Sequence, residues 1–443
     1  MDVLPLPPRP SLEQYRKRAK DLVKACKSSD DGAVRAWATA WLEALATRHD
    51  EPITPFVRGS IDRATAEIAR RVHEQRTSGD RAFGLSDAQF LIARAHGFAG
   101  WSAFSAHLDG LAFGGSETGE FEAAADAIVN GDLAALDALL TANPSLVHAR
   151  SPRTHRATLL HYVAANGVED FRQKSPANAV AIARRLLDAG AEPNAIAETY
   201  GGGKDQTTMN LLVSSTHPDE AGVQAPLVDT LLDYGAAIDG LDGDGSPLMT
   251  ALAFNYSTAA EALARRGARV DTVLTAAALG VGPAVERMVR EGGTLRPDVP
   301  LRAPAWLHVG NDPRAHVALA LVWACRFGRL EVAELLINKG IDANSADNDR
   351  MTALHWAAAS GRIELVDLLI RRGAELESVN RWGGTVLDST VYFAVRAPKR
   401  GVDYMPVLER LIARGADVHA VGPLPTGDAA IDTLLVRHGA RGS

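Results

Sequence analysis

The chain has 443 residues, of which 46% are hydrophobic, and a formal net charge of −7. This apolar content excludes an intrinsically disordered chain, and the negative charge excludes a broad basic surface for nucleic acid. Cys26 and Cys325 are the two cysteines, which excludes a disulfide framework and leaves no CxxC pair for zinc.

The apolar runs of the chain give no sign of membrane or secretory targeting. No stretch reaches the roughly 18 apolar residues that a membrane helix needs. The first 20 residues lack the apolar segment of a secretory signal. We therefore expect a soluble, cytoplasmic protein without a metal or another cofactor.

Residues 1–115 are predicted to form a separate, small helical domain. The segments SLEQ, from Ser11, and SDAQ, from Ser86, each fit a capping box before an amphipathic run. The glycine-containing stretch AFGGSETG at residues 112–119 is the predicted boundary. The second domain is expected to span residues 120–443.

From residue 121 onward the sequence predicts successive pairs of helices. The positions at which the two helices of a pair end lie 12 residues apart in five places, for example at Gly131 and Asn143. Glycine and asparagine tolerate the left-handed backbone that ends a helix. In three pairs, which end at Gly190, Gly235 and Gly415, the interval is longer, and the excess falls at the turn between the helices.

Two stretches in the C-terminal half are one structural unit written twice. They read LVWACRFGRLEVAELLINKGIDAN, from Leu321, and LHWAAASGRIELVDLLIRRGAELE, from Leu354. Their helix-ending glycines, such as Gly328 and Gly361, recur after 33 residues. A period of this length is typical of a repeat in which each unit stacks on its neighbours.

The stretch Thr352–Asn380 closely resembles ankyrin repeats, and residues 121–439 fit about eight units that end in a C-terminal half-repeat cap. The resemblance implies an all-α solenoid of helix pairs with β-hairpin arms. It also implies recognition of partner proteins through hairpin tips and first helices. In addition, residues 87–108 are similar to a helical module that precedes ankyrin repeats in some bacterial proteins.

Two of the insertions between paired helices carry the candidate residues for chemistry. Residues 168–178 place Glu169 and Arg172 around a phenylalanine, and residues 216–226 contain His217. A carboxylate beside a histidine can act as acid and base, and arginine can hold a carboxylate or phosphate. Charged turns are also ordinary on such an edge, so a solvated loop is the alternative. Tyr200, in the following hairpin, completes the set for a ligand or enzyme site.

Candidate residues for a protein partner lie at hairpin tips. Arg381 and Trp382 form one tip, where an exposed aromatic residue would be a recognition anchor. Packing of Trp382 against a neighbouring tip is the alternative. Asp347, Asn348 and Arg350, in the preceding arm, are the further candidate contacts.

A few further residues are conspicuous. Arg396, Lys399 and Arg400 make a local positive spot in the last insertion, which is either an electrostatic handle or a solvated turn. His161 and His355 occupy the same place in two repeats, and we expect each ring to bond hairpin backbone rather than a ligand.

Two functions of different classes remain open from the sequence. The first is a scaffold that binds a protein or peptide on the concave surface of the repeats. The alternative is a small-molecule-binding protein or enzyme with a pocket formed by the insertions at 168–178 and 216–226. The absence of GxSxG, HExxH, P-loop and dinucleotide motifs favours the scaffold.

Overall fold

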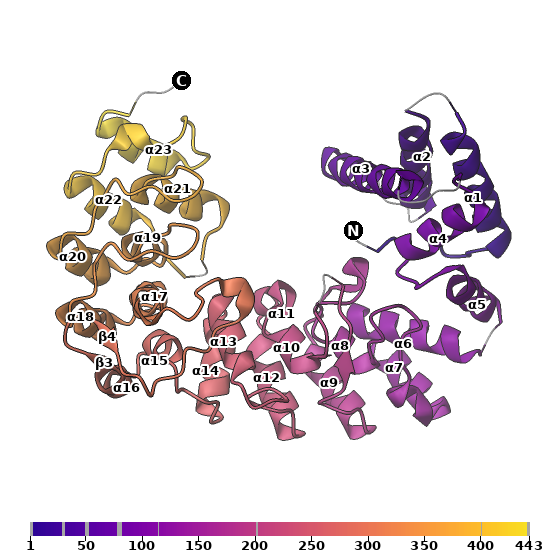
Figure 1. Ribbon diagram of the computed structural model, residues 1–443, viewed down its shortest axis with the longest axis horizontal. Helices are drawn as coiled ribbons and strands as arrows, with labels where there is room; N and C mark the ends of the chain where they lie inside the picture. The colour runs from indigo at the N-terminus through magenta and orange to yellow at the C-terminus, as the bar shows by residue number, and fades with distance from the viewer. Residues whose placement is uncertain are drawn as a thin grey trace. The chain divides into compact units, whose positions relative to one another are not determined.

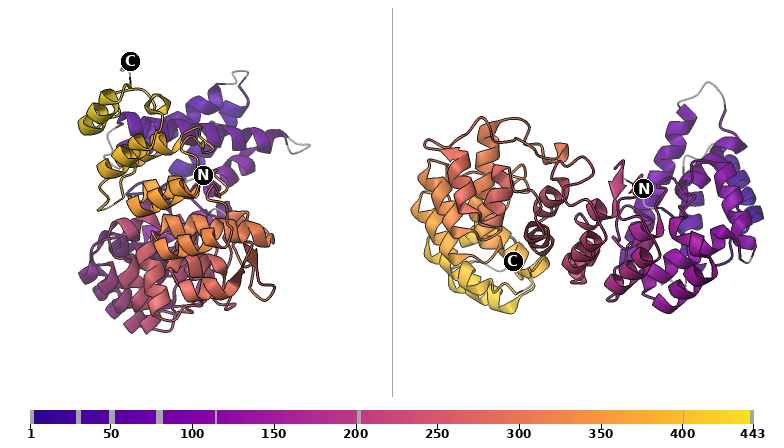
Figure 2. Two further views of the ribbon diagram at one scale, coloured as in Figure 1. Left: turned by 90° about the vertical axis from the view of Figure 1, so that its left-hand side faces the viewer. Right: turned by 90° about the horizontal axis from the view of Figure 1, so that it is seen from below.

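The computed structural model describes residues 3–28, 32–48, 53–77, 82–113, 115–200, 203–399 and 401–440. The chain forms two compact units, Met1–Ala237 and Ile238–Ser443. Both are built almost entirely from helices, and the strands among the described residues form two short antiparallel hairpins (Figures 1 and 2). The predicted all-α class is confirmed. None of the described helices is long and apolar enough to span a bilayer.

The first unit begins with five helices that share one hydrophobic core. They are α1 (Leu12–Cys26), α2 (Ala33–Arg48), α3 (Pro55–Thr77), α4 (Leu85–Ala95) and α5 (Trp101–Ala112). In α1 the buried residues Tyr15, Leu22 and Cys26 share one face, because a helix returns to that face every three or four positions. The Tyr15 ring meets His96 and Phe104 edge-on, with 5.1 and 4.9 Å between ring centroids. The boundary near residue 115 stays a prediction.

The segment before α1 is fixed to the end of α4 by backbone contacts. The Leu4 amide donates to the Ala95 carbonyl at 2.9 Å. Nδ1 of His96 lies 2.8 Å from the Leu4 carbonyl oxygen. Burial lowers the pKa of His96 to about 3, so its ring is neutral at physiological pH and Nδ1–H is the donor.

The rest of the first unit consists of helix pairs. Its elements are α6 (Glu117–Asn130), α7 (Leu133–Ala142), η1 (Pro144–His148), α8 (Leu159–Tyr162), η2 (Asp170–Arg172), α9 (Ala179–Asp188), β1 (Ile196–Ala197), β2 (Gln206–Thr207), α10 (Thr208–Leu212), α11 (Thr216–Glu220) and α12 (Gln224–Asp233). The 168–178 insertion contributes η2 between α8 and α9, and the 216–226 insertion contributes α11 between α10 and α12.

The second unit continues with the same kind of pair. Its elements are α13 (Ser246–Ala253), α14 (Ser257–Arg265), α15 (Val273–Leu279), α16 (Gly282–Met288), β3 (Val289–Arg290), β4 (Thr294–Leu295), η3 (Ala305–Leu307), α17 (Pro313–Arg326), α18 (Leu330–Asn338), α19 (Ala353–Ala359), α20 (Ile363–Arg371), α21 (Val386–Arg396), α22 (Met405–Ala413), η4 (Val418–Ala420) and α23 (Ala429–Arg437). Helices α15, α17, α19 and α21 pack in succession as a first-helix row, and α16, α18, α20 and α22 form the second row (Figure 1).

The start of α19 shows how each pair is joined to the next. Thr352 caps the helix by accepting the His355 amide at 3.2 Å, while Nδ1 of His355 accepts the Thr352 amide at 3.2 Å. Nε2 of the same ring reaches the Gly384 carbonyl of the next hairpin at 3.4 Å. His161 repeats this arrangement with Thr158 and Gln206. Both histidines therefore bond backbone, as expected.

Candidate functional site

The 168–178 insertion turns inward and completes a buried ionic cluster of Glu122, Arg153, Glu169 and Arg172. Nη1 of Arg153 lies 2.9 Å from Oε1 of Glu169 and also pairs with Glu122. Nη1 of Arg172 lies 2.8 Å from Oε2 of Glu122. All four residues are buried, and Glu169 has no exposed surface. The three-residue step from Glu169 to Arg172, wound as η2, lets both side chains enter the same cluster.

The ionic cluster holds its carboxylates in the charged form. Burial alone would raise the pKa of Glu122, but the guanidinium groups of Arg153 and Arg172 outweigh it and lower that pKa to about 2. Burial also opposes ionisation of Glu169, and Arg153 with His155 lowers its pKa well below the ordinary value. Such carboxylates stay ionised at neutral pH and are weak general bases.

Tyr200 joins the edge of the ionic cluster, whereas His217 lies elsewhere. The Tyr200 ring meets His155 edge-on at 5.0 Å between centroids, and His155 Nε2 lies 3.4 Å from Oε1 of Glu169. Burial raises the pKa of Tyr200, so its hydroxyl stays protonated. His217 is exposed on α11, and in the described part of the chain no hydrogen bond, ion pair or ring contact links it to the other three candidates, Glu169, Arg172 and Tyr200. Three of the four candidates therefore come together.

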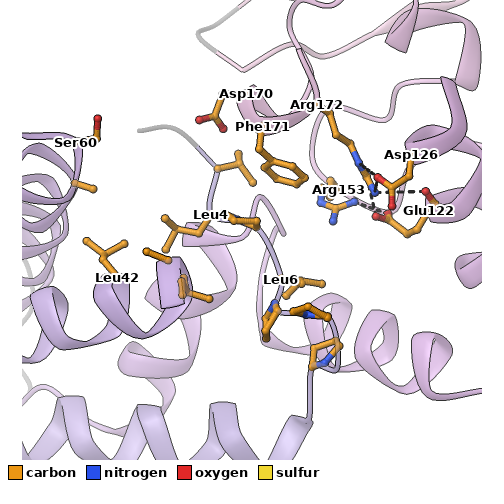
Figure 3. A pocket seen from close by; sticks show the side chains of 18 of the residues that line it. Leu4, Leu6, Leu42, Ser60, Glu122, Asp126, Arg153, Asp170, Phe171 and Arg172 are labelled. Atoms are coloured by element: carbon orange, nitrogen blue, oxygen red, sulfur yellow. Dashed lines mark hydrogen bonds and ion pairs between the residues drawn. The ribbon is translucent and has the colours of Figure 1, made fainter. Parts of the chain in front are cut away.

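A cleft of about 1020 Å³ opens beside the ionic cluster (Figure 3). One wall is the N-terminal segment with Leu4 and Leu6, another includes Leu42 of α2, and a third is formed by Phe171 and Arg172. Figure 3 shows Arg172 directed toward Asp126 and Glu122 at one side of the cleft. No residue of 216–226 lines it. The sequence could not predict this cleft, because the N-terminal segment and the first repeats meet only through tertiary packing.

Metal chemistry has no evident place among the residues that the structure describes. No group of three or more histidine, cysteine or acidic side chains in that part of the chain is arranged to hold an ion. Both cysteines are buried, and burial raises the pKa of each thiol, which disfavours the reactive thiolate.

The predicted tip is exposed in the second unit. Trp382 has 69% of its surface exposed, and the Arg381 guanidinium carbon lies 5.5 Å from the centre of its ring. Nη1 of Arg381 pairs with Oδ1 of Asp349 at 2.7 Å, and the Arg381 amide donates to the Asp349 carbonyl at 2.8 Å. These contacts fix the tip to the preceding hairpin and leave the indole in solvent.

The preceding arm divides into a structural and an exposed part. Oδ1 of Asp347 accepts the amides of Asp349 and Met351, at 3.0 and 2.9 Å, which closes the turn. Asn348 donates its side-chain amide to the Leu307 carbonyl. Arg350 is exposed and has a positive φ of 58° at the apex of this turn.

The first-helix row carries an aromatic patch that the sequence analysis did not select. It consists of Trp356 on α19 with Tyr392 and Phe393 on α21. The ring centroids of Trp356 and Phe393 lie 6.1 Å apart, and those of Tyr392 and Phe393 lie 5.9 Å apart. Tyr392 is 57% exposed. The large aromatic residues that follow Thr352 and Thr385 in the sequence were the available signal.

A family comparison agrees with the repeat architecture in part of the second unit. Residues 302–380 match the family model of ankyrin repeats (3 copies). No curated protein matches the chain. Among solved structures, the human ASB11 ankyrin repeat domain is 21% identical over 66% of this chain and 98% of that chain, with a TM-score of 0.32.

Proposed function

Because this chain is an ankyrin-repeat protein, with the repeats matched over residues 302–380, we propose that it is a scaffold that binds a protein or peptide. Ankyrin repeats generally serve as protein–protein interaction modules. The binding surface we propose is the aromatic patch on the first-helix row together with the tip formed by Arg381 and Trp382.

One observation carries the proposal: large aromatic side chains are left in solvent on this face. Trp382 and Tyr392 are more than half exposed, although a Trp or Tyr side chain gains much by burial. Tryptophan, tyrosine and arginine are also the residues that dominate binding energy at interfaces. The Arg381 guanidinium lies over the Trp382 ring, and Tyr392 meets Phe393, but these contacts leave more than half of each side chain exposed, whereas a partner surface would bury them.

Binding of displayed peptides to the full-length chain tests the proposal. A random peptide library is selected on the chain, and each selected peptide is measured against Trp382→Ala and Tyr392→Ala by fluorescence anisotropy. We expect either substitution to weaken binding by roughly 10-fold, the size of a moderate hot spot.

The matched control is Trp306→Ala, since Trp306 is also half-exposed but packs against Phe254, at 5.2 Å between ring centroids, and belongs to neither the aromatic patch nor the tip. Peptides that bind equally well to Trp382→Ala, Tyr392→Ala and the parent chain would refute the proposal, and so would a library that yields no binder.

A second candidate function is supported by the cleft beside the ionic cluster. Its volume of about 1020 Å³ suits a small molecule, and Arg172 and Phe171 combine a charge with an apolar wall. A thermal-shift screen with a metabolite panel tests it on the parent chain and on Phe171→Ala. A ligand that stabilises the parent but not Phe171→Ala supports this function. A panel without hits removes it.

A further inference from the structure

Two cationic side chains lie close to the Trp356 ring in the second unit, and neither forms an ion pair with a carboxylate of the described residues. The guanidinium carbon of Arg326, at the end of α17, lies 4.3 Å from the centre of the Trp356 ring. Nζ of Lys399, in the turn between α21 and α22, lies 5.7 Å from the same centre. Within the described residues, neither cation has a carboxylate oxygen within 4.0 Å.

Hydrogen bonds hold both cations in place. Nζ of Lys399 donates to Oγ of Ser360 at 2.9 Å, and that hydroxyl donates to the Arg326 carbonyl at 2.9 Å. The Lys399 amide donates to the Tyr404 hydroxyl at 3.1 Å. The charged end of Lys399 is therefore fixed next to α17 instead of extending into solvent as a lysine in a mobile turn would.

Arg326 is anchored through one side of its guanidinium group. Nε donates to Oδ1 of Asn255 at 3.1 Å, and Nη1 donates to the Ala253 carbonyl at 3.3 Å. Nη2 makes no hydrogen bond to the residues that the structure describes. The two bonds set the plane of the group, and Nη2 is left as a donor beside Trp356.

The surroundings of Arg326 and Lys399 disfavour two positive charges side by side. Burial, Arg326 and Arg362 lower the pKa of Lys399 to about 8. Burial lowers the pKa of Arg326 to about 10, although the Asp347 carboxylate acts in the opposite direction. An incoming anion would interact with both cations in a partly desolvated place, where ionic hydrogen bonds are strong.

The alternative explanation is that the carbonyl groups at the ends of α17 and α19 suffice to hold the cations. Helix C-termini do attract positive charge. They do not account for the free donor on Nη2 of Arg326, or for the approach of two cations to 4.3 and 5.7 Å from the centre of one aromatic ring.

We propose that Arg326, Lys399 and Trp356 form a site for an oxyanion, a carboxylate or a phosphate, carried by the bound peptide. The oxyanion accepts from Nη2 of Arg326 and from Nζ of Lys399, and the neighbouring apolar part of the peptide lies on Trp356 and Phe393. Arg400, the third member of the positive spot predicted from the sequence, lies outside the described residues. This inference rests on the proposed function and names the chemical class of its partner.

Matched peptides test the site on the full-length chain. Peptides selected from the library are resynthesised with each acidic residue replaced by its amide, Glu→Gln or Asp→Asn, or by phosphoserine. Binding is measured by anisotropy at low salt. We expect one acidic position at which the amide weakens binding about 10-fold, as for loss of a charge-assisted hydrogen bond, and at which phosphoserine is accepted.

Variants of the chain connect that position to the site. Lys399→Met should weaken the acidic peptide by a similar factor and leave the amide peptide unchanged, and Lys399→Arg should restore most of the loss. Arg326→Met should act in the same direction. A thermal melt of each variant shows that it is folded, and Lys399→Met keeps the test independent if Arg326→Met unfolds. The control is Arg371→Met, an exposed arginine on α20.

Each outcome decides the matter. Peptides that depend on Trp382 but bind Lys399→Met as tightly as the parent would overturn this inference and leave the proposed function intact. Absence of any Trp382-dependent peptide would overturn both. Inorganic phosphate is the remaining probe: if it binds in a Lys399-dependent manner while acidic peptides show no preference over amides, the site takes a free ion, and the peptide-borne oxyanion is refuted.

Discussion

The indole of Trp356 donates a hydrogen bond of 2.8 Å from Nε1 to Oδ2 of Asp347. The same carboxylate closes its own turn through Oδ1, so one side chain links the hairpin arm to the first-helix row. Asp347 was selected from the sequence as a partner contact. In the structure it positions the aromatic ring that we place at the centre of the binding surface.

Asp347→Asn should therefore impair binding more than folding. An amide turned to keep its oxygen on the turn amides presents an NH2 group to the indole N–H, and the ring loses its acceptor. We expect selected peptides to bind several-fold more weakly, with a change in the free energy of unfolding of about 1 kcal/mol. Anisotropy and urea denaturation measure the two effects. An unfolding cost far larger than this, with unchanged affinity, would contradict the assignment.

Removing one charge from the ionic cluster should be far more damaging than removing an exposed one. Arg153→Met leaves Glu122 and Glu169 buried without their principal partner. We expect this to lower the free energy of unfolding by about 4 kcal/mol. Arg381→Met breaks an exposed pair with Asp349 and should cost below about 1 kcal/mol. Urea denaturation compares the two variants, and equal costs would show that the cluster is not sealed from water.

Alanine substitutions at two helix-ending glycines, Gly361 and Gly373, test how closely neighbouring repeats pack. Gly361 and Gly373 both have positive φ, 70° and 87°, so alanine at either should cost roughly 1 kcal/mol in backbone strain. A Cβ at Gly361 would also meet Cγ1 of Val402 at 2.6 Å, whereas one at Gly373 meets nothing within 4 Å.

Gly361→Ala should thus lower the melting temperature clearly more than Gly373→Ala. Adding Val402→Ala to Gly361→Ala should recover the difference, because it removes the methyl group that clashes. Identical melting temperatures for the two single variants would mean that the turn between α21 and α22 does not pack on Gly361.

The buried histidines predict a loss of stability in mild acid. Burial lowers the pKa of His355 to about 4 in the folded chain, from about 6.5 when unfolded. As the pH falls, the unfolded chain therefore takes up the proton first. The contribution of His355 to the free energy of unfolding is fully present above pH 6.5 and decreases as the pH drops toward 4. His355→Gln should reduce the loss between pH 7.5 and 4.5 by roughly 2 kcal/mol. The exposed His419→Gln is the control, and an unchanged pH profile in His355→Gln would argue against a neutral buried ring.

Much of the fold follows from local patterns in the sequence. Gly361 and Gly373 have positive φ, a local backbone requirement that can be read from the sequence. The 12-residue interval between such residues therefore predicted the helix pairs. The hydrogen bond from the Thr352 amide to the His355 ring was likewise predictable, since Thr352 lies one helical turn before His355.

The candidate site was only partly predictable, for the opposite reason. Glu169 and Arg172 are three residues apart and enter the cluster together, but Arg153 and Glu122 reach it through packing of distant segments. His217 was expected beside them because its insertion occupies the same topological place. Its residues wind into α11 instead and leave the ring in solvent.

The approach of Arg326 and Lys399 to the same ring could not be predicted from the sequence either. The two residues belong to different repeats, and the turn that carries Lys399 has no repeating pattern from which its course could be inferred. Tertiary hydrogen bonds, among them those through Ser360, bring the two charges to one ring.

The reach of His355 to the following hairpin has a consequence for how the stack comes apart. Where such a ring is present, its hydrogen bond to the next hairpin links two adjacent repeats, and this bond is lost when the repeats separate. Where Val322 or Met249 stands in its place, the seam lacks this histidine bond, although other hydrogen bonds, such as that from Ser360 to the Arg326 carbonyl, remain. The stability of a repeat stack is a sum of the stabilities of its repeats and of the interfaces between neighbours. Opening under denaturant or mechanical load will therefore start at the interfaces that lack the histidine bond. The repeat that begins at Thr352 will stay folded onto its successor for longer.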